Sequence, residues 1–513
     1  MLGRHLPNAN GLRGAKVGRP VGWQGPPTPS PVALEDRATG LYVLRVGALY
    51  THRRIFDAWR TSSEERMAFP RNGSGVAFWS MLLFVELVTV CLHLPSLRDA
   101  HIEGDEIVFT FLAERLTQDP FAYHLRGVLE GNAAERFLAD TRTSGRNTPA
   151  RGVPVERGSP ESVEPKRVAL LDSASETVRT FVYDSSIYGQ PMFFHPPVYP
   201  YTLAGFRRIL GRVGGPLLSI LAHGFTILLV GLPGRRWGGP TLGLLAATLV
   251  SIDPVSWLCG SRLWIDGTLE MMTVASMLAM SWAVDSRRKG AFIMAGMTFG
   301  ITCLTKYPGI LVAPAVMGAA LVAKTPPSRK QVGWYLVAAL ALVGPWILLM
   351  RFKYGAWVPD SRPTLWIIDR ASYVARAANR PWYFYPPGLL MVAPVYVYCV
   401  ATLTTIRAQR WLLIPLIWAL GFVGGLTLLG RYGYGFQLRY LAPAMPAFCL
   451  LCAAGIVHVR WLATLAVPLS FAAFLSGYRP ALQPGFAEPI PVLLNAFLHW
   501  MGSDLSRVTP QMW

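Results

Sequence analysis

Two adjacent carboxylates, Asp105 and Glu106, stand after the first long apolar segment of the chain and before an amphipathic run, 107–116. As structural residues they would begin a helix, with Asp105 capping its first turn and Glu106 inside it, where the helix dipole favours negative charge. As functional residues they suit a general base at the mouth of a membrane cavity, acting on an acceptor hydroxyl. The two interpretations are compatible, and the pair is the first candidate site.

A histidine and an arginine–aspartate pair provide the next candidates. His195 precedes Pro196 and Pro197, an order that also suits a rigid lead-in to a helix, because proline is accepted in the first helical turn. Arg262 and Asp266 are four residues apart, and this spacing allows an ion pair on one helical face. Asp266 could instead cap the helix that follows.

Two basic positions follow at the ends of later apolar segments. Lys306 lies in Thr305–Pro308, a short stretch between two such segments, where a lysine can extend its side chain to the membrane surface. Arg439 precedes Tyr440, and arginine beside tyrosine is also an ordinary interface anchor. Each motif taken alone is therefore compatible with a structural role.

The composition places these residues in a membrane protein. Of 513 residues, 52% are hydrophobic and only 15% are charged, against about 25% in a soluble domain. Apolar runs of about 17–20 residues recur from Val76 onward, each long enough to cross a bilayer. The net charge of +19 would suggest nucleic acid in a soluble chain, but here Lys and Arg gather in loops that the positive-inside rule keeps in the cytoplasm. We therefore expect an all-α polytopic protein without a nucleic-acid partner, in the plasma membrane (the inner membrane of a bacterium) or in the endoplasmic reticulum of a eukaryote.

The basic loops predict eleven spans, with the N-terminus in the cytoplasm and the C-terminus outside. This count keeps every basic loop inside only if the segment 196–210 lies on the outer interface instead of crossing. The basic loops are those at 234–236, 286–289, 324–330, 407–410 and 459–460. The predicted spans are approximately 76–95, 213–232, 240–258, 267–284, 290–305, 307–323, 334–350, 386–406, 411–429, 440–457 and 462–477.

This topology, drawn from the loops, also collects the unusual polar residues on the outer side. Ionisable residues at the ends of membrane spans are costly unless they are paired or used, which makes them site candidates. They are Asp105, Glu106, His195, Arg262, Asp266, Lys306, Arg431 and Arg439.

Three regions are expected along the chain. Residues 1–75 form a cytoplasmic, largely disordered region, because a composition rich in Pro, Gly and Arg cannot bury enough apolar surface. Residues 76–477 form the transmembrane domain, whose first outer loop, about 96–212, contains a low-complexity insertion at about 141–167. Residues 478–513 form a non-cytoplasmic segment. No cleavable signal peptide is evident, and the six cysteines lie in or beside apolar spans, with no disulfide or zinc spacing.

The order of the motifs is more specific than any one of them. The acidic pair is followed by His-Pro-Pro, Arg-x-x-x-Asp, Thr-Lys and Arg-Tyr-x-x-Pro-x-x-Pro. Over about residues 76–460 this order resembles the GT-C membrane glycosyltransferases related to the dolichyl-phosphate-mannose protein mannosyltransferases and the lipid A aminoarabinose transferase. The chain departs from the pattern in its longer first-loop insertion, and no sizeable soluble domain follows the last predicted span.

The resemblance implies an enzyme that moves a sugar from a polyprenyl phosphate to a protein, lipid or glycan acceptor on the non-cytoplasmic side, with inversion. It implies that Asp105 is the catalytic base, with Glu106 beside it, and that Asp266 lines the cavity. The basic positions that match the family near the donor phosphate are His195, Lys306 and Arg439.

The chemistry of the residues agrees with that assignment. Displacing a polyprenyl phosphate from an anomeric carbon leaves negative charge on the phosphate, and fixed cations stabilise that charge. His195, Lys306, Arg262, Arg431 and Arg439 could supply the positive charge with no cofactor required. A divalent ion on the carboxylates stays open as an alternative, although oxygen ligands this scattered are weak support for one.

Aromatic residues provide candidates for the cavity and acceptor side. Trp382 and Tyr383 belong to an aromatic outer loop, 351–385, and Tyr199 follows the His-Pro-Pro motif. Such side chains stack on sugars, but an aromatic loop is equally typical of an interfacial belt.

Two other functions stay open. A secondary transporter usually carries ionisable residues near the bilayer midplane and has repeated halves with broken helices, whereas the charges here stand at span ends. A glycan ligase that uses a lipid diphosphate donor would share the fold, and only a donor assay separates it from the first hypothesis.

Overall fold

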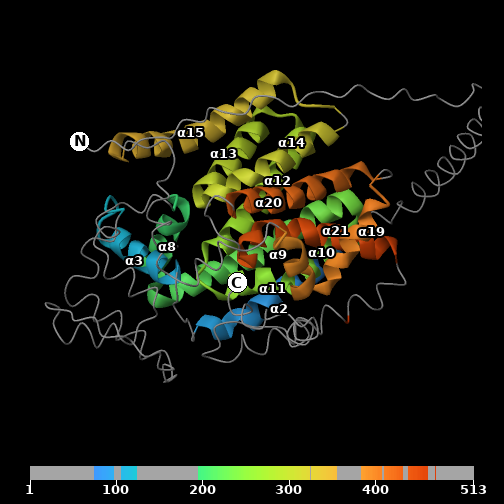
Figure 1. Ribbon diagram of the computed structural model, residues 1–513, viewed down its shortest axis with the longest axis horizontal. Coiled ribbons are helices and arrows are strands. Elements are labelled where there is room, and N and C mark those ends of the chain that lie inside the picture. The colour runs from blue at the N-terminus through green and yellow to red at the C-terminus, as the bar shows by residue number, and fades with distance from the viewer. Residues whose placement is uncertain are drawn as a thin grey trace, which may run out of the picture. The chain divides into compact units, whose positions relative to one another are not determined.

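The computed structural model describes residues 74–97, 105–123, 195–323, 325–354, 383–406, 409–430 and 437–459, together with residue 468. Within these ranges all regular structure is helical (Figure 1). The prediction of an all-α chain is therefore confirmed. Apart from the first residue of α2, the described helices belong to one compact unit, residues 75–513.

The chain's first described helix, α2 (Ser74–His93), has one face against the protein and one face outside it, and the 3-10 turn η1 (Leu94–Leu97) follows. Leu82 is fully buried, whereas Leu83 and Leu87 keep 52% and 59% of their surface exposed. Leucines cover an outward face at little cost only where that face meets lipid. α2 therefore has the pattern of a helix at the lipid boundary.

The acidic pair begins a short helix that packs on another short helix. α3 (Asp105–Gln118) starts at Asp105 and lies beside α8 (Val198–Leu210) (Figure 1). The turn η2 (Gly211–Val213) separates α8 from the long helix α9 (Gly214–Gly238). Gly211 has a φ of 63°, in the left-handed region that favours glycine. The segment predicted to lie on the interface is thus a helix of its own, while its depth in the membrane stays a prediction.

The predicted span 240–258 is divided into two helices. α10 (Pro240–Ser251) and α11 (Pro254–Ser261) are bent by 58° relative to each other. Asp253 caps α11, because its Oδ1 accepts a hydrogen bond of 2.8 Å from the backbone N–H of Ser256. Pro254 has no N–H to continue the ladder of the preceding helix. The predicted span 240–258 is therefore built from two helices with a bend at Asp253.

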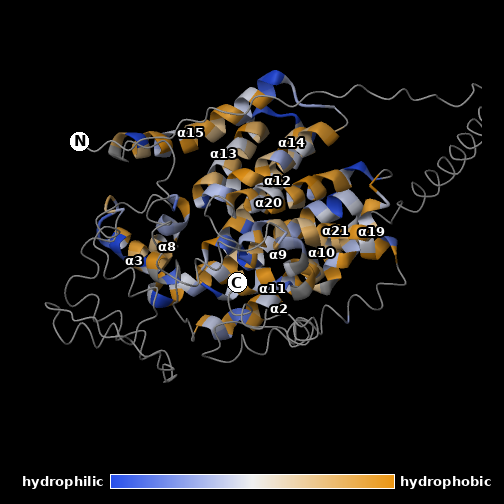
Figure 2. Ribbon diagram, viewed as in Figure 1, coloured by the Kyte–Doolittle hydropathy of each residue, from blue (hydrophilic) through white to orange (hydrophobic). Residues whose placement is uncertain are grey.

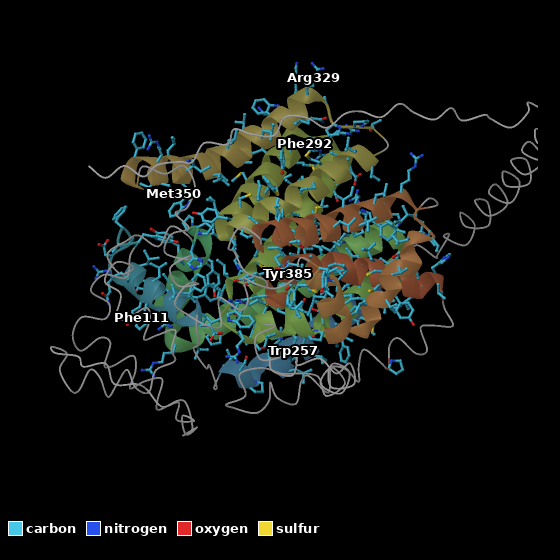
Figure 3. The ribbon with its side chains drawn as sticks, in the orientation of Figure 1. Phe111, Trp257, Phe292, Arg329, Met350 and Tyr385 are labelled. Carbon is cyan, nitrogen blue, oxygen red and sulfur yellow. The ribbon has the colours of Figure 1, made fainter. Side chains whose placement is uncertain are left out.

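The middle of the chain forms a group of antiparallel helices. α13 packs lengthwise against both α12 and α15, and α14 follows the turn η3 (Figure 1). Their bounds are α12 (Ile265–Ser286), α13 (Lys289–Thr305), η3 (Tyr307–Val312), α14 (Ala313–Val322) and α15 (Arg329–Tyr354). In Figure 3 Arg329 projects from the start of α15, at the end of the helix away from Met350.

The C-terminal helices return to the centre of the unit. α21 packs against α10, α19 and α20. The bounds are α18 (Tyr385–Val392), η4 (Pro394–Val397), α19 (Tyr398–Leu403), η5 (Arg410–Leu412), α20 (Leu413–Leu429), η7 (Leu438–Ala444) and α21 (Met445–His458). Tyr385 lies among these central helices and is fully buried (Figure 3).

The chain is a multi-pass membrane protein. Apolar residues cover most of the described helices (Figure 2). Within the described ranges, 5 helical segments are long and apolar enough to cross a bilayer, or 6 if the bent α10–α11 pair is one span. Apart from the bent pair, the candidate segments are Gly75–Leu97, Val198–Gly238 (which includes α8, η2 and α9), Arg329–Phe352, Arg410–Leu429 and Leu438–His458. The count of eleven, and the orientation, concern the whole chain and stay predictions.

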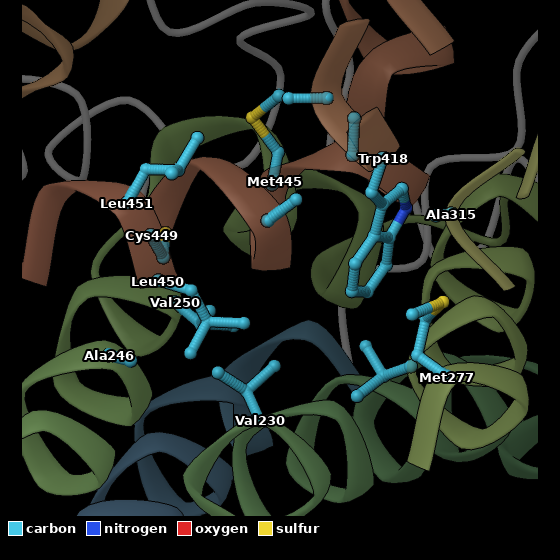
Figure 4. Close-up of a cluster of buried hydrophobic side chains, with 14 of the residues drawn as sticks. Val230, Ala246, Val250, Met277, Ala315, Trp418, Met445, Cys449, Leu450 and Leu451 are labelled. Atoms are coloured by element: carbon cyan, nitrogen blue, oxygen red, sulfur yellow. The ribbon is translucent and has the colours of Figure 1, made fainter. Parts of the chain in front are cut away.

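The core is built from small and large apolar side chains of several helices. Figure 4 shows Val230 of α9, Val250 of α10, Met277 of α12 and Trp418 of α20 converging on α21. Trp418 is fully buried. Since lipid tails are as apolar as leucine, such helices associate through close packing and buried polar contacts more than through removal from water. The buried polar contacts are therefore the informative ones.

Candidate active site

Glu106 is buried in the first turn of α3, with 1% of its surface exposed. Its Oε1 accepts a hydrogen bond of 2.8 Å from the backbone N–H of Leu263, and its Oε2 lies 4.0 Å from Nη1 of Arg262. Residues 262–264 lie between α11 and α12, outside both helices, which leaves the N–H of Leu263 available. Glu106 thus connects α3 with the turn that leads into α12.

Asp266 and Lys306 form a buried ion pair. Lys306 donates from Nζ to Asp266 Oδ1 across 2.6 Å, with 7% and 2% of the two residues exposed. Asp266 lies in the first turn of α12, and Lys306 follows the last residue of α13, so the antiparallel packing of these helices brings the two together. A charge-assisted bond of this length in a buried place is a strong one.

This pair corrects three expectations. Arg262 does not pair with Asp266, because residues 262–264 are not helical and the four-residue spacing does not place both side chains on one face. Asp266 makes no capping bond: the capping position of α12 is Trp264, which has no side-chain cap. Lys306 does not reach for the membrane surface either, since its ammonium group is held inside.

Aromatic faces hold both Lys306 and Arg439. The ring of Tyr440 lies 4.4 Å from Lys306 Nζ and 5.4 Å from Arg439 Cζ, and the ring of Trp264 lies 4.5 Å from Arg439 Cζ. Arg439 also donates from Nε to Gln437 Oε1 across 2.6 Å. We call Lys306, Arg439, Tyr440 and Trp264 the cation cluster. Its two cations come from the residue after α13 and from η7, far apart in sequence, and the ring of Tyr440 contacts both.

Tyr199 connects the acidic pair with the cation cluster. Its side chain is fully buried on α8, and its ring meets that of Phe109 edge to face at 5.0 Å. Phe109 lies one turn after Glu106 on α3. The Tyr199 hydroxyl is within electrostatic range of the carboxylates of both Glu106 and Asp266. The structure therefore places six of the candidate residues near one another: Glu106, Asp266, Lys306, Arg439, Arg262 and Tyr199.

His195 lies on the α3 side of this group. Its ring is 4.5 Å from that of Phe109, and its backbone carbonyl accepts a hydrogen bond of 2.9 Å from the Tyr123 hydroxyl. Burial raises the pKa of the Tyr123 phenol well above its ordinary value, so the group stays a neutral donor. His195 is thus fixed through its backbone, next to the helix that carries Glu106.

Several predicted site residues are not placed by the structure. Asp105 is the first residue of α3, and its side chain is outside the description. Arg431 and Trp382 lie outside the described residues. Tyr383 is described and keeps 55% of its surface exposed. The part assigned to Asp105, Arg431 and Trp382 therefore stays a prediction.

Other buried acids were missed. The Ser256 hydroxyl donates to Glu270 Oε1 across 2.7 Å, and the same serine's N–H binds Asp253. Tyr396 donates its hydroxyl proton to the other oxygen of Asp253. Glu270 follows Asp266 by four residues, a spacing that places it one turn further along the same helical face. That spacing is the signal that the sequence offered. Among the described residues, no group of three or more His, Cys, Asp or Glu side chains is arranged to hold a metal ion.

Comparison with known proteins adds the fold. Residues 194–348 match a family model described as dolichyl-phosphate-mannose-protein mannosyltransferase. The structure is similar to ArnT from Cupriavidus metallidurans in the apo state, with 16% identity, a TM-score of 0.51, and 84% of this chain and 68% of ArnT covered. No protein of curated function matches the sequence significantly.

Two further similarities are weaker. ArnT from the same organism bound to undecaprenyl phosphate has a TM-score of 0.49 at 15% identity, covering 86% of this chain and 73% of that one. The Archaeoglobus fulgidus oligosaccharyltransferase, solved with Zn and sulfate, has a TM-score of 0.36 at 15% identity, covering 59% and 44%. At 16% identity the likeness to apo ArnT concerns the fold alone. The chain is an all-α membrane protein of the GT-C fold, and its residues 194–348 are similar to the family described as dolichyl-phosphate-mannose-protein mannosyltransferase.

Proposed function

We propose that the protein is a membrane glycosyltransferase, which moves a sugar from a polyprenyl-phosphate donor to an acceptor hydroxyl. The observation that carries the proposal is the cation cluster: two buried cations share the ring of Tyr440, and Lys306 is paired with a buried carboxylate. Lys306, Asp266 and Trp264 lie in the segment that matches the mannosyltransferase family model. Buried cations are costly in a membrane protein unless they are paired or used. Recognition of a phosphate is the use that best fits their chemistry.

The cation cluster would stabilise the leaving phosphate. When the bond between the anomeric carbon and the phosphate oxygen breaks, negative charge grows on the phosphate, and cations fixed in advance lower the energy of that transition state. Arg439 offers a planar guanidinium for two parallel hydrogen bonds, and Lys306 offers a point charge. Because both side chains are already held by Tyr440, Trp264 and Gln437, little reorganisation is needed when the donor arrives.

Asp105 would serve as the general base. Both oxygens of its neighbour Glu106 already face protein donors, the N–H of Leu263 and the guanidinium of Arg262. Glu106 therefore suits a role in holding the turn, and Asp105 is the carboxylate that we assign to the acceptor. The acceptor oxygen attacks the anomeric carbon, the bond to the carrier phosphate breaks, and Asp105 takes the acceptor's proton. One displacement of this kind inverts the anomeric configuration.

The class of carrier comes from the neighbours. ArnT has been solved with undecaprenyl phosphate, and the family model names a dolichyl-phosphate sugar. Both are polyprenyl phosphates with a single phosphate group. We place the site on the non-cytoplasmic face, because the basic loops assign the C-terminal end of α13 and the start of α21 to that side. The sugar and the acceptor, whether protein, lipid or glycan, are to be found by assay.

The test uses the full-length protein in lipid nanodiscs with radiolabelled polyprenyl-phosphate sugars and extracts of possible acceptors. Wild-type protein should move label from the carrier to a product, whereas Asp105→Asn should remain folded and lose nearly all transfer. A matched control is Asp119→Asn, at an exposed acid after the same helix, which should transfer label normally. Normal turnover by Asp105→Asn would remove the base from the scheme, and absence of transfer with every polyprenyl phosphate would reject the function.

One observation favours a different function. The α10–α11 break, with the buried acids Asp253 and Glu270 beside it, is a feature that secondary transporters use at the bilayer midplane. Proteoliposomes loaded with the protein would then accumulate a substrate without changing it chemically. Uptake of an intact sugar or ion, together with absence of label transfer, would favour this alternative over the enzyme.

A further inference from the structure

Two cysteines from neighbouring helices meet inside the protein. The sulfur of Cys399, on α19, lies 3.3 Å from the sulfur of Cys452, on α21. Each sulfur is also placed by a backbone carbonyl: Cys399 lies 3.6 Å from the oxygen of Phe448, and Cys452 lies 3.4 Å from the oxygen of Val395. Both cysteines are reduced in the structure.

The backbone explains why the sulfurs meet. Gly455, three residues after Cys452, packs against the carbonyl of Tyr398, the residue before Cys399. A Cβ at Gly455 would collide with that oxygen, so glycine permits an approach of the two helices that other residues prevent. The position of the two sulfurs therefore follows from helix packing and not from one freely rotating side chain.

We propose that Cys399 and Cys452 are a disulfide-forming pair, oxidised by dioxygen dissolved in the membrane. A disulfide bond is about 2.05 Å long, so the sulfurs need to come roughly 1.3 Å closer. In the reaction each thiol gives up its proton, a bond forms between the two sulfurs, and the two protons and two electrons reduce one dioxygen to hydrogen peroxide. This inference is independent of the proposed function.

The surroundings favour an apolar oxidant. Cys452 is fully buried, while Cys399 is half-buried. Val397 and Val400, which are close to Cys399 in sequence, keep 56% and 63% of their surface exposed. On a membrane protein such exposed valines face lipid. Dioxygen and other small apolar molecules can reach Cys399 from that side, whereas charged oxidants stay in water.

The bond would fix helices close to the candidate active site. α21 follows η7, which carries Arg439 and Tyr440. η4, directly before α19, carries Tyr396, whose hydroxyl lies 3.3 Å from the sulfur of Met445 at the start of α21. A disulfide between α19 and α21 would therefore join the elements on both sides of this contact by a covalent bond.

Cys449 provides a matched control. It lies on the same helix as Cys452, three residues earlier, and is equally buried. It lines a small pocket together with Asp253 and Tyr396. In the described part of the chain its sulfur has no other sulfur at hydrogen-bond distance. If burial in α21 alone made a thiol reactive, Cys449 would react as readily as Cys452.

The experiment uses full-length protein in nanodiscs, treated in air with the lipid-soluble catalyst copper–phenanthroline. Free thiols are then alkylated with N-ethylmaleimide in denaturant, and the peptides are identified by mass spectrometry. We expect a linked Cys399–Cys452 peptide that dithiothreitol separates, with Cys449 alkylated. Cys449→Ser should keep the link and Cys399→Ser should lose it. The oxidised wild type should also melt at a higher temperature than the reduced protein, a shift that Cys399→Ser lacks.

Two results would overturn the proposal. One is complete alkylation of both Cys399 and Cys452 after oxidation that links an exposed cysteine pair added elsewhere as a positive control. The other is a link through Cys449, or between two copies of the chain, in place of the Cys399–Cys452 peptide. Either result shows that the 3.3 Å contact is only a thiol hydrogen bond.

Discussion

The ammonium group of Lys306 is bound by the carboxylate of Asp266, 2.6 Å away, in a place where both side chains are buried. The cation proposed to meet the donor phosphate is therefore already neutralised before any donor binds. A phosphate would share Lys306 with Asp266 instead of meeting an isolated charge. This arrangement lets a cation stay buried in the empty protein, and it makes Asp266 as important for folding as Lys306 is for binding.

Replacing Lys306 alone should damage both stability and activity. Lys306→Met leaves Asp266 buried without its partner, which costs about 3–5 kcal/mol in comparable buried pairs. The double variant Lys306→Met with Asp266→Leu removes both charges and should regain most of the melting temperature, but sugar transfer should stay at least about 100-fold reduced, as expected when a group that stabilises transition-state charge is lost. Melting in nanodiscs and transfer of label measure the two effects separately. Recovery of transfer in the double variant would show that Lys306 acts only in folding.

Tyr440 should act through its ring and not its hydroxyl. Tyr440→Phe keeps both cation–ring contacts and should bind a polyprenyl phosphate almost as wild type does. Tyr440→Leu loses two contacts of roughly 0.5–2 kcal/mol each, so the KM for the donor should rise on the order of 10-fold. Equal KM values for the Leu and Phe variants would contradict the importance of the ring.

Glu106 should tolerate loss of charge better than loss of its acceptor oxygen. Glu106→Gln keeps an oxygen for the N–H of Leu263 and weakens the 4.0 Å contact with Arg262, which is long for an ion pair. Glu106→Ala leaves the buried N–H unsatisfied, at a cost of about 1–3 kcal/mol. Chemical denaturation should therefore rank wild type and Gln together and Ala below them. The same rank for Gln and Ala would mean that the charge is what stabilises the turn.

The Ser256–Glu270 bond should matter for stability and not for transfer. Ser256→Ala removes the hydroxyl that binds Glu270 across 2.7 Å and leaves a buried carboxyl oxygen unsatisfied, at a cost of about 1–3 kcal/mol. Transfer measured per folded molecule should stay at the wild-type rate. A lower rate with an unchanged melting temperature would instead place this pair in the reaction.

The fold could be predicted from the sequence because long apolar runs and basic loops are local signals, and the order of the motifs can be read directly along the chain. The candidate site residues were selected on a related signal, because ionisable residues at span ends are costly unless they are paired or used. The ion-pair partners of these residues could not be predicted. Lys306 and Asp266 are 40 residues apart in sequence and meet because α12 and α13 pack antiparallel, whereas sequence spacing pointed to Arg262 as the partner of Asp266.

The break at Asp253 was likewise visible as an Asp-Pro step, but an apolar run of sufficient length suggested a single crossing. A proline within such a run can kink a helix or end it, and tertiary contacts decide between the two outcomes. Here the contacts are the cap on Ser256 and the bond from Tyr396, a residue 143 positions further along the chain. The cap is local to residues 253–256, but the bond from Tyr396 cannot be read from the sequence around Asp253.

The 58° bend between α10 and α11 also determines the direction in which the chain enters the following turn. A straight helix over residues 240–261 would extend roughly 33 Å, about the thickness of the hydrocarbon layer, and would deliver its last residue to the water. Because the chain changes direction at Asp253, the backbone N–H of Leu263 lies inside the protein instead, where Glu106 accepts a hydrogen bond from it. The bent helix pair thus leads to a buried contact, in which an acid from one helix holds the turn before another.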